Sequence, residues 1–168
     1  MNLPVARDLA VGLALGTIDA SDAIAWADHW IMALDHPPYW LIEISTARDA
    51  SARDLLHFIP EPSTSAEPSD IELLGAIAVR LIDRAEPLGI LLPILMDRFC
   101  FCDWTEMTAT RQSIYLIDDE LGWDPERAVR TASKLLENYV DEGRRQLART
   151  LATPPTGPIP SPTPAPDS

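Results

Sequence analysis

The stretch over residues 21–45, SDAIAWADHWIMALDHPPYWLIEIS, decides the fold. Its first half carries two adjacent apolar stripes at helical spacing: Ile24, Ala27, Ile31 and Leu34, and beside them Trp26, Trp30 and Ala33. Because a helix that is apolar on two faces belongs in the interior, the rest of the chain is expected to cover it. The prolines at 37 and 38 end this helix and suit the first turn of a second one, which continues to about residue 47. The stretch therefore predicts two helices that meet at a tight corner.

The remainder of the chain shows the same helical character. Apolar periodicity with start and stop signals predicts a short turn after residue 51 and helices over residues 4–15, 69–86, 88–101, 108–122 and 124–151. Ser21 is the expected cap of the residue-21 helix, and Thr105 or Thr108 that of the helix ending at 122. No segment alternates between apolar and polar residues as a strand does. We therefore predict an all-α protein, a single compact bundle of about seven helices.

The C-terminal end differs sharply in composition from this predicted helical domain of residues 1–151. Seven of the 16 residues from 153 to 168 are prolines, a density that excludes both helix and core. Residues 152–168 are therefore predicted to be a disordered, extended tail with polyproline II character. Pro155-Thr-Gly-Pro158 matches a PxxP ligand pattern, although such a match is nearly unavoidable in so proline-rich a segment.

The chain is strongly acidic, with a formal net charge of -13 at pH 7. This charge repels phosphates, so binding to nucleic acid or to an anionic membrane is not expected, whereas a basic protein partner is favoured. The longest apolar run, residues 88–96, is about half of the roughly 20 residues needed to cross a bilayer. The apolar run at residues 9–16 follows Asp8 where a signal peptide carries positive charge, so it is interpreted as helix. We predict a cytoplasmic protein.

Signals for catalysis are missing from the sequence. No serine lies in a nucleophile-elbow pattern and no glycine loop could cradle a phosphate. His29 and His36 are seven residues apart, whereas metal-binding pairs on helices usually lie three or four apart. Cys100 and Cys102 are interpreted as two small buried side chains. The sequence therefore predicts that the protein is not an enzyme and holds neither metal nor cofactor.

The densest negative region covers residues 103–126, which hold seven acids and one base, Arg111. Adjacent carboxylates on a helix point apart and the spacing is not that of a calcium loop, so a metal site is disfavoured. Aromatic anchors beside carboxylates suit an interface with a basic protein. The predicted partner-binding residues are Asp103, Trp104, Glu106, Asp118, Asp119, Glu120, Trp123, Asp124 and Glu126, with Asp22, Asp28 and Asp35 as a second candidate surface. The alternative is an ordinary solvated face, with both tryptophans packed against the core.

Three segments carry a family resemblance: LALGTIDASD at residues 13–22, AWAD at 25–28 and PPYWLIEIS at 37–45. Together they resemble the small all-helical immunity proteins of bacterial polymorphic toxin systems. The resemblance covers about residues 10–47 and is a packing signature without shared functional residues. It implies a cognate inhibitor that binds a toxin domain and blocks its active site or substrate channel.

Charge agrees with that implied role. An acidic helical domain could cover a basic nuclease-type cleft, with carboxylates standing in for phosphates and steering association. The functional hypothesis is therefore an immunity protein whose partner is a basic, cognate protein toxin. The alternative is a helical adaptor or regulatory module, whose acidic surface only confers solubility and whose tail tethers or spaces it. A third hypothesis is an enzyme that uses aspartate and glutamate with a metal.

Overall fold

The computed structural model describes residues 6–60, 67–101 and 108–152. These residues form helices and connecting loops without any strand, which confirms the prediction of an all-helical fold. The predicted proline-rich tail, from residue 153 onward, lies outside the described residues. Within the part of the chain that the structure describes, no helix has the length and apolar character needed to cross a membrane.

The helices follow one another through short connections. The first four are α1 (Ala6–Ala14), α2 (Ala20–Ala33), α3 (Tyr39–Thr46) and the single turn α4 (Ala52–Leu55). Next come α5 (Asp70–Ala78), which runs into a π-helical segment (Val79–Asp83), α6 (Leu88–Cys100) and α7 (Ala109–Trp123). The last are α8 (Pro125–Leu136), a 3-10 turn (Glu137–Tyr139) and α9 (Val140–Thr150). As predicted, the prolines at 37 and 38 separate α2 from α3.

Most helix starts follow the side-chain chemistry that the sequence indicated. Ser69 and Glu72 form a reciprocal capping box at the start of α5. The Thr108 side chain caps α7 by accepting from the backbone N–H of Arg111, which settles the choice between Thr105 and Thr108. Asp124 caps α8 directly before the proline in its first turn. These local signals fixed the helix boundaries because each acts within one turn of chain.

The expected cap at Ser21 is wrong. The side chain of Asp19 accepts the backbone N–H of Asp22 at 2.8 Å, so α2 begins two residues earlier than a Ser21 cap would allow. The Ser21 hydroxyl instead donates to the Asp19 carboxylate at 2.7 Å. This bond and the backbone N–H of Asp22 hold the pKa of Asp19 below its usual range.

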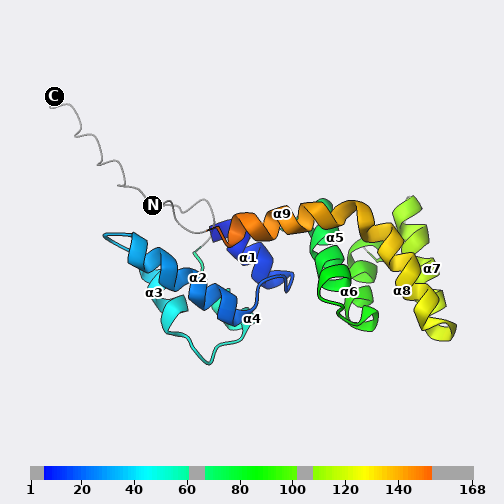
Figure 1. Ribbon diagram of the computed structural model, residues 1–168. Coiled ribbons are helices and arrows are strands. Elements are labelled where there is room, and N and C mark those ends of the chain that lie inside the picture. The colour runs from blue at the N-terminus through cyan, green and yellow to red at the C-terminus, as the bar shows by residue number, and fades with distance from the viewer. Residues whose placement is uncertain (1–5, 61–66, 102–107, 153–168) are drawn as a thin grey trace.

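The core is divided into two hydrophobic clusters. Figure 1 shows the two groups of helices, α1 to α4 and α5 to α8, from which most of their residues come. The N-terminal cluster is built mainly from α1 to α4 and contains most of the apolar side chains of the residue 21–45 stretch. The C-terminal cluster is built mainly from α5 to α8. Two helices belong to both: α1 gives Leu9 to the first cluster and Val11 to the second, while Leu147 and Val140 of α9 pack against the first and second respectively. Helices α1 and α9 therefore join the two clusters.

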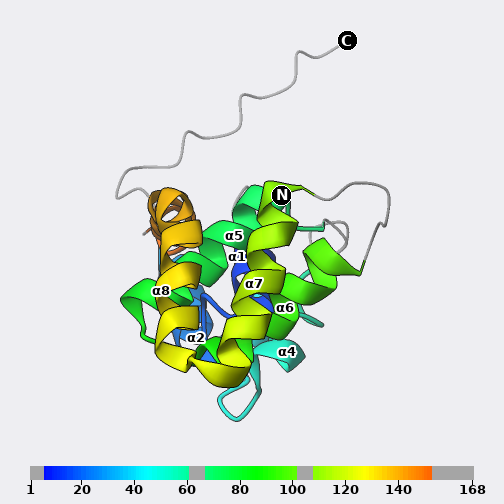
Figure 2. The same ribbon diagram turned by 90° about the vertical axis from the view of Figure 1, so that its right-hand side faces the viewer.

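The C-terminal helical region turns a corner that the sequence did not predict. We expected one helix over residues 124–151, but the 3-10 turn Glu137–Tyr139 separates α8 from α9. As Figures 1 and 2 show, α8 lies beside α7, whereas α9 runs across the molecule toward α1. The periodicity on either side of the turn is helical, so the break reflects the need of one segment to pack on α7 and the other on α5 and α1.

A pair of glycines forms the crossing of α5 and α9. A Cβ atom added at Gly75 would lie 2.8 Å from the backbone nitrogen of Gly143. A Cβ added at Gly143 would meet the backbone carbonyl of Gly75 and would lie 2.8 Å from a methyl group of Val79. Because two of these three neighbours are backbone, neither helix can accept even a methyl group without moving.

Charged side chains also join the two clusters. Arg7 of α1 donates two hydrogen bonds, of 2.7 and 3.0 Å, to the Glu72 carboxylate of α5. This guanidinium lowers the pKa of Glu72 to about 2, assisted by the Ser69 cap. Directly after the C-terminal end of α1, the Leu15 carbonyl accepts a hydrogen bond from Arg80 at 2.9 Å, and the Gly16 carbonyl accepts one from Arg84. Cations thus satisfy the free carbonyls after the α1 C-terminus, where the helix dipole favours positive charge.

Candidate functional site

The predicted acidic surface is described in part. Asp103, Trp104 and Glu106 lie outside the described residues. The other six belong to the α7–α8 hairpin or to its connection, at the end of the molecule that Figure 2 faces. Asp118, Asp119 and Glu126 are exposed, and among the described residues neither Asp118 nor Asp119 forms an ion pair.

Glu120 differs from its acidic neighbours. Its side chain is only 1% exposed, and one carboxylate oxygen lies 2.6 Å from the Arg127 guanidinium. The other oxygen accepts the Thr131 hydroxyl at 2.6 Å. The buried Glu120 side chain thus links α7 to α8 through its ion pair and its hydrogen bond. It cannot contact a partner, so the prediction that it is a binding residue is wrong.

Trp123 shows the opposite behaviour. It ends α7 with 60% of its surface exposed, although sequence alone left open whether its ring packs against the core. The Arg127 guanidinium stacks 5.5 Å from the ring centroid, which holds the indole in place by a cation–π contact. Leu116, 47% exposed, lies two turns earlier on the same face of α7, and Asp119 lies between the two.

We call this group the hairpin surface and define it by Leu116, Asp119, Trp123 and Glu126, with Asp118, which points about 140° away from Trp123 around α7, at its margin. Asp124 remains at its edge, because its side chain is committed to capping α8 through the backbone N–H of Arg127. The surface combines a large exposed ring, an aliphatic side chain and carboxylates. It can therefore offer both apolar contact and negative charge to a partner.

The second candidate surface is not continuous. Asp22 and Asp28 both belong to α2, but they are six residues apart and so point about 120° away from each other. The Asp28 carboxylate accepts the Ser45 hydroxyl of α3 and so helps to hold α2 against α3. Asp35 is exposed and lies beyond the end of α2. The structure thus does not bring these three acids together.

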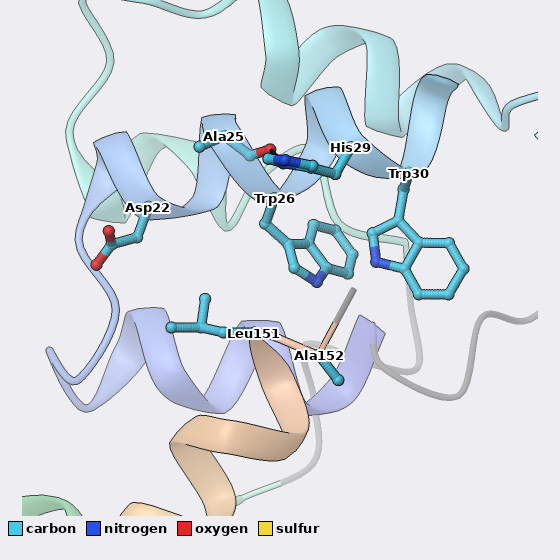
Figure 3. A pocket seen from close by; sticks show the side chains of 7 residues that line it. All are labelled: Asp22, Ala25, Trp26, His29, Trp30, Leu151 and Ala152. Atoms are coloured by element: carbon cyan, nitrogen blue, oxygen red, sulfur yellow. Dashed lines mark hydrogen bonds between the residues drawn. The ribbon is translucent and has the colours of Figure 1, made fainter. Parts of the chain in front are cut away.

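A site that the sequence reasoning missed lies under α2. One face of this helix, together with the end of α9, lines a pocket of about 190 Å³, and the lining residues are Asp22, Ala25, Trp26, His29, Trp30, Leu151 and Ala152 (Figure 3). Five of these residues recur at helical spacing along α2, which is a signal visible in the sequence. The opposite wall comes from residues far away in the chain, which no local pattern could indicate. We call this site the α2 pocket.

The α2 pocket carries two hydrogen-bond donors without partners. Trp26 is only 5% exposed, and its indole nitrogen forms no hydrogen bond with any described residue; the same holds for the buried indole nitrogen of Trp30. Figure 3 shows both rings projecting from α2 toward Leu151 and Ala152. The ring centroids of Trp26 and Trp30 lie 5.9 Å apart, and the ring centroid of Trp40 on α3 lies 6.2 Å from that of Trp26. His29 bonds to the Ala25 carbonyl at 2.6 Å.

The described part of the chain holds no cluster of metal-ligating side chains. Among these residues, no three histidine, cysteine or carboxylate side chains lie close enough to hold a metal ion. Cys100 is buried, and its burial raises the pKa of its thiol, which makes it a weak nucleophile. Cys102 lies outside the described residues.

Comparison with known proteins identifies no relative. No family model, no curated protein and no solved structure matches the chain.

Proposed function

We propose that this chain is an immunity protein that binds a basic cognate toxin through the hairpin surface and so blocks the toxin. The observation that carries the proposal is Trp123, a large exposed ring held by Arg127, with the exposed carboxylate of Asp119 one turn earlier on the same face of α7. Tryptophan is enriched among the residues that carry most of the binding energy at the centres of protein interfaces.

Electrostatics supports the same partner chemistry. The formal net charge of -13 would speed the approach of a basic protein and slow that of an acidic one. Once the two surfaces meet, Trp123 and Leu116 would supply apolar burial while the flanking carboxylates pair with lysine or arginine. In a nuclease-type toxin those cations would be the ones that otherwise hold substrate phosphates. We expect this encounter to take place in the cytoplasm.

The experiment begins with the partner. A protein captured from the native cell counts as the toxin only if its expression alone stops growth and co-expression of this chain restores growth. Protection is then compared between two full-length double variants, Asp118→Lys with Asp119→Lys and Asp35→Lys with Asp49→Lys. Both pairs are exposed and both change the net charge by the same amount.

We expect the first variant to bind at least tenfold more weakly, on the order of 1.4 kcal/mol or more, and to lose protection while keeping its helical circular dichroism. The second variant should protect like the native chain. Equal protection by both variants would refute the assignment of the hairpin surface. If the partner binds through the hairpin surface but is harmless when expressed alone, the chain is an adaptor or regulatory module instead.

A further inference from the structure

The α2 pocket is separate from the hairpin surface and has donor chemistry of its own. We propose that it binds the proline-rich segment of this same chain that begins at Thr153. The proposal rests on three features: two buried donors that have no partner among the described residues, aromatic walls, and the position of Ala152, the last described residue, in the pocket lining.

The donors of the pocket complement what a proline-rich segment offers. A proline residue has no backbone N–H, so a run of prolines presents carbonyl acceptors and flat pyrrolidine rings. The indoles of Trp26 and Trp30 present N–H donors and ring faces toward the same space (Figure 3). Aromatic-lined grooves that recognise polyproline II segments use this combination, because the segment is already extended and loses little entropy on binding.

The size and charge of the pocket agree with such an occupant. Its volume of about 190 Å³ suits one or two residues of a narrow extended chain, with the residues on either side crossing its open mouth, rather than a helix or a folded domain. Residues 153–158, TPPTGP, carry no charge, so the Asp22 carboxylate in the lining does not repel them. A polyproline II segment rises about 3.1 Å per residue, so these residues can cross a pocket of this size.

The position of the pocket favours the chain's own segment over a segment of another protein. Leu151 and Ala152 form one wall, so the proline-rich sequence starts at the pocket itself. A segment tethered this closely has a high effective concentration at the site, on the order of millimolar or more, which a free peptide must match. Even a weak intrinsic affinity would therefore keep the pocket occupied.

Hydrogen exchange of the indole N–H groups tests this proposal in the full chain. A proximal variant replaces Pro154, Pro155 and Pro158 with serine, and a matched distal variant replaces Pro162, Pro164 and Pro166 with serine. In both variants, NMR would follow the indole N–H signals of Trp26 and Trp30, with the exposed Trp123 as an internal reference. Exchange at Trp26 and Trp30 should become about tenfold faster in the proximal variant and should not change in the distal variant. The serine-substituted segment keeps its carbonyls but loses the pyrrolidine rings and the preformed extended conformation, so it no longer holds those acceptors in the pocket.

Two outcomes would overturn the proposal. The first is exchange at Trp26 and Trp30 that is the same in the native chain and in the proximal variant, or that changes equally in both variants. The second is a native chain that exchanges like the proximal variant but becomes protected when a synthetic Thr-Pro-Pro-Thr-Gly-Pro peptide is added. That result would assign the pocket to a proline-rich segment of a separate molecule.

Discussion

The hairpin surface and the α2 pocket both rely on tryptophan but use it in opposite ways. Trp123 exposes its ring, which Arg127 holds by a cation–π contact, whereas Trp26 buries its ring and its N–H has no partner among the described residues. An exposed ring provides apolar surface that a partner can bury. A buried N–H without a partner instead requires a hydrogen-bond acceptor at one defined position. Two tryptophans in one small helical protein can therefore serve different kinds of binding site, a protein interface and a pocket for a peptide segment. The residues next to each tryptophan in the sequence do not show which kind it serves.

The two regions also belong to different hydrophobic clusters, and the largest predicted effect tests whether these clusters respond separately. Leu41 in the N-terminal cluster and Leu95 in the C-terminal cluster are both fully buried. Changing either to alanine removes buried methyl groups and leaves a cavity, which should lower the free energy of unfolding by about 3 kcal/mol. Hydrogen exchange of backbone amides measures where each variant loosens.

Leu41→Ala should accelerate exchange mainly in α2 and α3, and Leu95→Ala mainly in α6 and α7. Each variant is the control for the other, because the two changes remove the same atoms. Equal acceleration through both clusters in either variant would mean that the molecule opens as one unit, and the comparison of two regions would then be wrong.

A somewhat smaller effect is expected where the two clusters are joined. Gly143→Ala would push a methyl group into the backbone of α5 at Gly75, so we expect a loss of about 2–3 kcal/mol in the free energy of unfolding, measured by urea titration. The control is Gly122→Ala on α7, where a Cβ would meet nothing within 4 Å. That change should be neutral or stabilising by about 0.5–1 kcal/mol, because alanine is the better helix former. Similar losses in both variants would contradict the close α5–α9 crossing.

Local signals explain what the sequence predicted well. The capping box at Ser69, the cap and proline at the start of α8, and the prolines after α2 each act within one turn, so their effect can be read without knowing the fold. Division of the core could not be predicted in this way. It depends on α1 and α9 each giving residues to both clusters, which is decided by contacts between distant segments.

The binding residues show the same limit. All three acids at residues 118–120 were predicted to bind the partner, but each residue along a helix turns by 100°, and the third acid points inward. There it meets Arg127 and Thr131, which lie on the next helix and could not be matched to it from spacing alone. The α2 face of the pocket had a visible pattern, but its opposite wall at Leu151 and Ala152 did not.

The smallest predicted effect concerns pH and the ion pair between Arg7 and Glu72, which also joins the two clusters. Arg7 lowers the pKa of Glu72 to about 2 in the folded protein, below its value of about 4.3 in an unfolded chain. The ionised carboxylate therefore stabilises the fold above about pH 4.3, and this contribution is lost as the pH falls toward 2. We expect it to be about 1–2 kcal/mol, since the partly exposed Arg7 is screened by water.

Other carboxylates, including Asp83 beside Arg144 and Glu86 beside Arg80, also have a lowered pKa, so the native chain alone does not isolate Glu72. The difference between the native chain and Glu72→Gln does. Urea titrations at pH 7 and pH 3 should show that the destabilisation caused by Glu72→Gln is smaller at pH 3. A difference that is the same at both pH values would show that the Glu72 carboxylate does not contribute through its charge.

The hairpin surface, rather than the α2 pocket, is proposed to contact the partner, and a hydrogen-exchange footprint of the complex tests that claim most directly. The full chain is compared free and saturated with its identified partner, and protection is mapped along the backbone. We predict slower exchange over α7 and the start of α8, with α2 unchanged. Protection confined to α2, with the α7–α8 hairpin unchanged, would contradict the proposed binding mode.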